Sequence, residues 1–81
     1  MKLPRDYHAS ELIQALHRYG YAVTRQTGSH IRLTSTLNHA EHHVTVPEHK
    51  TISTSTLSYI MGDVASYLNK DKQAFIEELF G

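Results

Sequence analysis

Apolar positions recur with the period of an α-helix in two stretches of this chain. The first begins at about Asp6 or His8 and ends before Gly20, a residue typical of helix C-termini. Its apolar stripe is Ala9, Leu12, Ile13, Leu16 and Tyr19. The second follows three hydroxyl residues at positions 53–55, any of which could be its N-cap. Its stripe is Leu57, Ile60, Met61, Val64, Ala65 and Leu68, the most regular in the chain.

Between these stretches, the chain is rich in β-branched and aromatic residues that alternate with polar ones, a pattern typical of β-strands. It predicts strands over residues 21–26, 30–36 and 43–46. A glycine turn over residues 27–29 joins the first two as a hairpin, and Pro47 ends the third strand.

The order helix, three strands, helix predicts an α+β fold: a three-stranded antiparallel sheet with both helices on one face. We expect one domain over residues 1–81, with a flexible arm over residues 1–5. A short terminal helix over residues 70–80 would have Asn69 or Asp71 as its N-cap. The other face of the sheet would be open, which is ordinary for an antiparallel sheet.

The hairpin places chemically useful side chains on this open face. If Ile31 and Leu33 face the core, alternation puts His30 and Arg32 on the opposite side, and His43 takes the corresponding position on the third strand. A histidine can transfer protons at neutral pH, because its ordinary pKa is about 6.5. The open face thus combines a proton carrier and a cation beside a glycine turn.

Composition limits what this face can bind. Eight basic and eight acidic residues give a formal net charge of zero, which argues against a strong indiscriminate polyanion binder. Locally, however, three arginines and no acid lie from Arg18 to Arg32. The chain has no cysteine and no apolar run long enough for a membrane span or signal peptide. We therefore expect a soluble, cytoplasmic protein.

A cluster of histidines suggests a metal site as an alternative function. Its members are His39, His42, His43 and His49. His42 and His43 are neighbours on a predicted strand, so their side chains point to opposite faces and are poorly placed to ligate one ion. No cysteine or nearby aspartate completes a ligand set. We therefore expect neither a metal nor a cofactor.

Five landmarks follow one another in the sequence: ELI in the first helix, GYAV after it, GSH at the turn, VTVP on the third strand and TL opening the second helix. Over roughly residues 10–65, the chain resembles the HicA family, also called YcfA-like, of toxins that act as mRNA interferases. The resemblance implies a fold like the double-stranded RNA-binding domain, α-β-β-β-α. It also implies that His30, in the glycine-serine-histidine turn, is catalytic.

The implied function is the toxin of a type II toxin–antitoxin system, a metal-independent endoribonuclease that cleaves mRNA and is neutralised by a HicB-type antitoxin. The basic candidates would hold phosphate, and amides around the turn glycine would form an anion-binding concavity to which the serine adds a hydroxyl. His43 is also the candidate for a second proton carrier. The candidate RNA-binding residues are Arg25, Gly28, Ser29, Arg32 and His43.

The alternative is a non-catalytic RNA-binding module on the same fold, which reads the shape of an RNA helix. Such a module is expected to present lysines at the start of its second helix, where this chain reads ISTSTL. Tyr19 and Tyr21 could stack on bases, but both flank the end of the first helix and are expected in the core. The GSH turn favours the ribonuclease.

Overall fold

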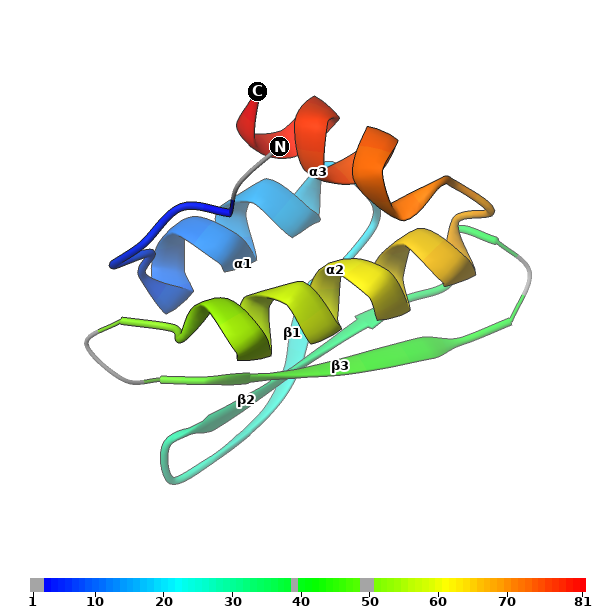
Figure 1. Cartoon of the computed structure of the whole chain (residues 1–81). Helices are drawn as coiled ribbons and strands as arrows, with labels where there is room; N and C mark the ends of the chain where they lie inside the picture. Colours follow the sequence, from blue (N-terminus) through cyan, green and yellow to red (C-terminus); the bar gives the residue numbers. More distant parts are fainter. Residues whose placement is uncertain (1–2, 39, 49–50) are drawn as a thin grey trace.

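The computed structural model describes residues 3–38, 40–48 and 51–81, and within them it contains three helices and three strands (Figure 1). In chain order these are α1 (Ala9–His17), β1 (Ala22–Thr27), β2 (His30–Ser35), β3 (His42–Pro47), α2 (Thr54–Tyr67) and α3 (Lys72–Phe80). The strands form one antiparallel sheet in the order β1-β2-β3. The predicted α+β fold with a short C-terminal helix is confirmed.

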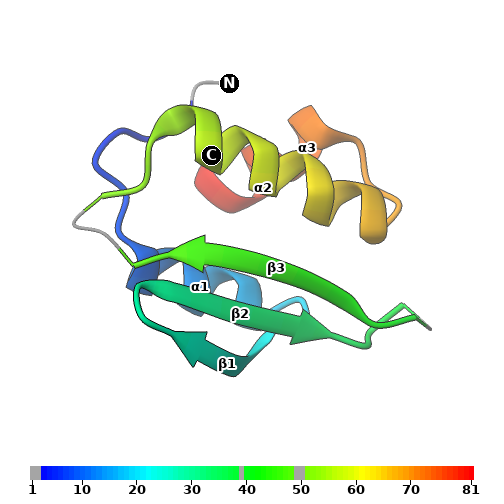
Figure 2. The same cartoon turned by 90° about the horizontal axis from the view of Figure 1, so that it is seen from below.

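The helices all lie on the same side of the sheet. Helix α1 contacts β1 and β3, α2 contacts β3, and α3 packs against α2 (Figures 1 and 2). The opposite face of the sheet carries no helix in either view. In the described ranges, no helix has the length and apolar character needed to span a membrane.

The core fills the space between sheet and helices. Every residue of the predicted second stripe is buried except Leu68, and from the first stripe Ala9, Leu12 and Leu16 are buried. Tyr21 is completely buried, as expected, and Tyr19 packs against the edge of the core. Leu3, in the predicted arm, is also partly buried against the core, and residues 1 and 2 lie outside the described residues. Phe75 and Ile76 bring α3 into the same core.

Capping interactions set the helix ends. His8 is the N-cap of α1, and its backbone N–H donates to the Glu11 carboxylate over 3.1 Å. The helix ends at His17, two residues before Tyr19, because the chain turns over residues 18–20 into Gly20 at a φ of +85°. Among the predicted alternatives, Ser53 caps α2 and Asp71 caps α3, each accepting a backbone N–H three residues later.

Candidate nucleic-acid interface

A register shift in the β1–β2 ladder decides which side chains of β1 reach the open face. Tyr21 is buried, so strict alternation would direct Arg25 toward the helices as well. The register instead slips between Val23 and Arg25, as in a β-bulge. Val23 then pairs with buried Leu33, while Arg25 pairs with Arg32 on the open face.

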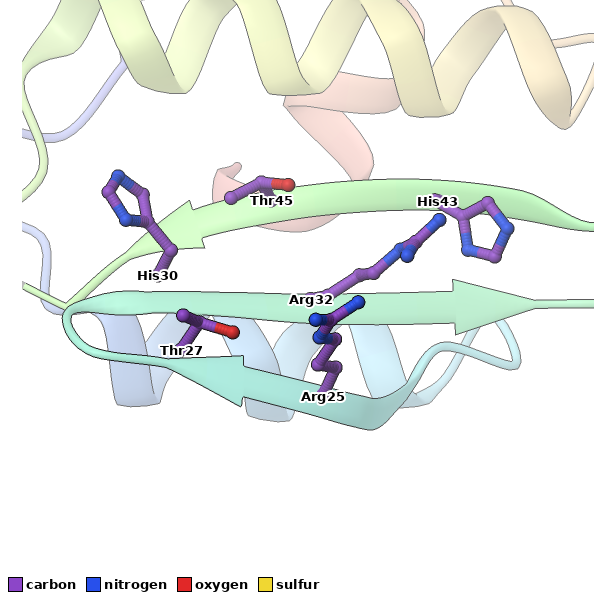
Figure 3. A pocket seen from close by; sticks show the side chains of 6 residues that line it. All are labelled: Arg25, Thr27, His30, Arg32, His43 and Thr45. Carbon is purple, nitrogen blue, oxygen red and sulfur yellow. The ribbon is translucent and has the colours of Figure 1, made fainter.

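Side chains from all three strands surround a hollow of about 330 Å³ on the open face (Figure 3). The strand register arranges them in rows: Thr27 lies opposite His30, and Arg32 lies between Arg25 and Thr45. His43 lies at the far end, opposite Thr34. The lining residues are Arg25, Thr27, His30, Arg32, His43 and Thr45. Four of the predicted site residues are thus brought together.

The hollow carries positive charge from two arginines. Arg25 and Arg32 are direct cross-strand partners, and like charges in that position repel. Within the described part of the chain, neither arginine forms an ion pair with an acidic side chain. In Figure 3, Arg32 extends toward the His43 ring and the Arg25 guanidinium lies over β2. This arrangement is suited to an anion, because two guanidinium groups can donate hydrogen bonds to one acceptor group.

The two histidines of the hollow differ in how firmly they are held. His43 has its Nδ1 2.8 Å from the Thr34 hydroxyl, which in turn lies 2.8 Å from the Thr24 hydroxyl. The His43 Nε2 lies 3.8 Å from a Glu41 carboxylate oxygen. His30 is exposed, and its ring forms no hydrogen bond with any residue that the structure describes. His30 is therefore free to meet a ligand with either nitrogen.

The turn beside His30 is a two-residue hairpin loop of Gly28 and Ser29. Gly28 has a φ of +58°, which favours glycine, although a Cβ there would meet no atom within 4 Å. The Ser29 carbonyl accepts the Glu48 backbone N–H, which ties the turn to the end of β3. Neither turn residue lines the hollow, and anion binding by the turn amides stays a prediction.

A second polar cluster, on the helix side of the sheet, is not visible in the sequence. The His42 ring stacks on Tyr67 and places Nδ1 2.6 Å from the Tyr21 hydroxyl and Nε2 3.2 Å from Asp63. Burial is the main cause that raises the pKa of Tyr21, and the negative charges of nearby Tyr67 and Asp63 raise it further. The predicted opposite orientation of His42 and His43 is confirmed, since His43 bonds on the open face.

The metal alternative gains no support from the described residues, which contain no group of three His, Cys, Asp or Glu side chains arranged to hold an ion. Two of the histidines that suggested it, His39 and His49, lie outside the described residues.

Comparison with known families adds one finding. A family model for the HicA toxin of bacterial toxin–antitoxin systems matches residues 9–65, which is more than half of the 81 residues. The match runs from the start of α1 into α2 and includes every residue that lines the hollow. No curated protein and no solved structure matches the chain.

Proposed function

This chain belongs to the HicA toxin family, and from this premise we propose that it is an endoribonuclease that cleaves mRNA with His30 as its catalytic residue. As a member of this family it is the toxin of a toxin–antitoxin pair. We further propose that its inhibitor is a HicB-type antitoxin and that the reaction needs no metal ion.

The observation that carries the proposal is the position of His30 in the same hollow as the Arg25–Arg32 pair. RNA cleavage through the 2′-hydroxyl needs a base for the hydroxyl proton and cations for the charge that develops on the phosphate. The exposed imidazole of His30, which has no hydrogen-bond partner among the described residues, supplies the base. The two guanidinium groups supply the positive charge. A general acid–base group typically contributes about 10² to 10⁴ in rate.

In the proposed reaction, the His30 imidazole accepts the proton of the 2′-hydroxyl while the 2′ oxygen attacks the neighbouring phosphorus. The bond from phosphorus to the 5′ oxygen breaks, and that oxygen leaves as a hydroxyl after taking a proton from water. The positive charge of Arg32 and its cross-strand partner Arg25, in the row next to His30, electrostatically stabilises the negative charge that develops on the non-bridging oxygens. The products are a 2′,3′-cyclic phosphate and a 5′-hydroxyl.

The geometry argues against His43 as the second proton carrier. His43 lies opposite Thr34, four residues along β2 from His30, which corresponds to about 13 Å of strand. Its ring is also held by Thr34 and faces Glu41. The two histidines are therefore poorly placed to flank one scissile phosphate, and we assign His43 to RNA binding.

The alternative, a non-catalytic module that reads duplex RNA, has less support. Such a module needs cations at the start of its second helix, yet the first turn of α2 holds only hydroxyl residues and a leucine. Two arginines, Arg25 and Arg32, instead line one hollow on the sheet.

The test compares RNA cleavage by the wild type with that by His30→Ala and, as a matched control, His43→Ala. We expect His30→Ala to lose at least about 10² in the rate at saturating RNA, and to abolish toxicity in growing cells. His43→Ala should keep that rate and bind RNA more weakly. Circular dichroism checks that both variants fold. An unchanged rate in His30→Ala, with the fold intact, would rule out the assignment.

A further inference from the structure

We propose that the hollow holds two successive phosphates of a single-stranded RNA, the scissile one beside His30 and its neighbour in a second site formed by Arg25, Arg32 and His43. This inference rests on the proposed ribonuclease function and specifies how its substrate is bound.

The length of the hollow is the first argument. His30 and His43 are both among its lining residues, although their rows are separated by four residues of β2, or about 13 Å. A single phosphate group is too small to contact both ends. Two rows of the same sheet face lie about 7 Å apart, which is comparable to the separation of neighbouring phosphates in an extended strand.

The arginine pair is the second argument. Arg25 reaches this face only because the register slips after Val23, and the slip sets it directly against another cation. A phosphate between the two guanidinium groups would accept hydrogen bonds from both and remove their repulsion. In Figure 3, both guanidinium groups lie on the His43 side of the hollow, away from His30.

The setting of His43 completes the second site. The Thr34 hydroxyl lies 2.8 Å from the His43 Nδ1, so the ring is oriented and Nε2 is the nitrogen left to face a ligand. The only neighbour of Nε2 among the described side chains in ion-pair range is Glu41, at 3.8 Å, which is longer than a hydrogen bond. The Glu41 side chain is exposed, so a phosphate can replace it without disturbing the core.

The location of the site favours a single strand over a duplex. The three strands are together only about 10 Å wide, and the lining offers arginine, histidine and threonine side chains. Recognition of duplex RNA uses helix surfaces that span two minor grooves. Phosphate contacts position a nucleic acid without reading its bases, so we expect weak discrimination of base sequence at this second site.

The experiment measures binding of 2′-O-methyl oligouridylates, which cannot be cleaved through the 2′-hydroxyl, by fluorescence anisotropy at several salt concentrations. For single strands, each neutralised phosphate contributes about 0.7 to the slope of log K against log salt. We expect Arg25→Gln and Arg32→Gln each to lower the slope, and the double variant, which loses both contacts to the second phosphate, to lower it by up to about 0.7. Arg18→Gln removes the same charge from the helix layer and should leave the slope unchanged.

Oligomer length provides the second measurement. Affinity should rise from the dinucleotide, with one phosphodiester, to the trinucleotide, with two. A methylphosphonate at the second linkage should weaken binding to the wild type more than to Arg25→Gln, because the two changes share one contact. Equal affinity for dinucleotide and trinucleotide, an equal slope change in Arg18→Gln, or tighter binding of a duplex of the same length would overturn the inference.

The results separate this inference from the proposed function. If RNA cleavage depends on His30 but the slope does not depend on Arg25, the second phosphate site is wrong and the function stands. If no cleavage occurs but the slope depends on Arg25 and Arg32, the catalytic function is wrong and the two-phosphate site stands.

Discussion

Arg25 and Arg32 lie directly opposite each other across the β1–β2 ladder, although both carry a positive charge. Such a pair costs stability in the free protein, by roughly 0.2 to 1 kcal/mol in typical sheets. Neither arginine has an acidic partner among the described residues. A bound anion could therefore neutralise the two charges, as an internal ion pair would.

Removing one of these charges should therefore stabilise the free protein. We expect Arg25→Thr to raise the free energy of unfolding by a few tenths up to about 1 kcal/mol at low salt, because threonine suits a strand and does not repel Arg32. High salt should shrink the gain by screening the repulsion. Urea unfolding at two salt concentrations measures both effects. A destabilised variant at low salt would show that the arginines interact favourably.

The products of cleavage report the nucleophile. If the 2′-hydroxyl attacks, the fragments end in a 2′,3′-cyclic phosphate or its hydrolysis product and begin with a 5′-hydroxyl. Mass spectrometry of the fragments distinguishes these ends, and a substrate with 2′-deoxyribose at the scissile position should resist cleavage. Fragments with a 5′ phosphate would instead indicate attack by water.

Cleavage should continue in the presence of EDTA. The proposed reaction assigns proton transfer to His30 and charge stabilisation to the positive field of the Arg25–Arg32 pair, so it uses no divalent ion. The measurement is the initial rate of RNA cleavage before and after dialysis against EDTA. Strong inhibition that is reversed by one divalent ion would identify a metal requirement that the proposed mechanism lacks.

The antitoxin should cover the open face of the sheet. A HicB-type partner with acidic groups set against Arg25 and Arg32 would associate faster and with a salt dependence that a purely apolar contact lacks. Arg18 carries the same charge but lies at the end of α1 in the helix layer, so it is not part of this face. We expect the double variant Arg25→Glu, Arg32→Glu to bind the antitoxin more weakly at low salt, as measured by calorimetry. Unchanged affinity, or a complex that leaves His30 exposed, would place the inhibitory contact elsewhere.

Alkaline pH should destabilise the fold through its tyrosines. The pKa of Tyr19 is raised from 10.0 to about 12, mainly by burial and also by the hydrogen bond to Glu78. Burial also raises the pKa of Tyr7 and of Tyr21. Their contribution to stability is complete below pH 10, where unfolded tyrosine is neutral. It is lost as the pH rises from about 10 toward 12, because the unfolded chain then releases protons that the folded chain retains.

The measurement is the urea midpoint between pH 8 and pH 11.5. Tyr19→Phe should make the alkaline decline shallower, although it also removes the hydrogen bond to Glu78 and lowers stability at neutral pH. Tyr59→Phe is a control, since Tyr59 is 74% exposed. A midpoint that stays constant above pH 10 would contradict the expectation.

The order of elements and the orientation of β2 follow from the sequence by itself. Helical and strand periods are properties of the local backbone, so the alternation of Ile31 and Leu33 suffices to place His30 and Arg32 on the open face. Element ends were less accurate: β1 and β3 differ from the predicted strands by one residue at each end, and α1 ends before Tyr19. End positions depend on caps and turns, for which several neighbouring residues often qualify.

Only the tertiary structure decided the position of Arg25 and the role of His42. Alternation from buried Tyr21 would have turned Arg25 inward, and the register of β1 against β2 reverses that orientation. The hydrogen bonds of His42 join residues as far apart in the sequence as Tyr21 and Asp63. Both features arise from the pairing of segments that are distant in the sequence. The packing of the whole core determines this pairing, and the local hydrophobic period does not predict it.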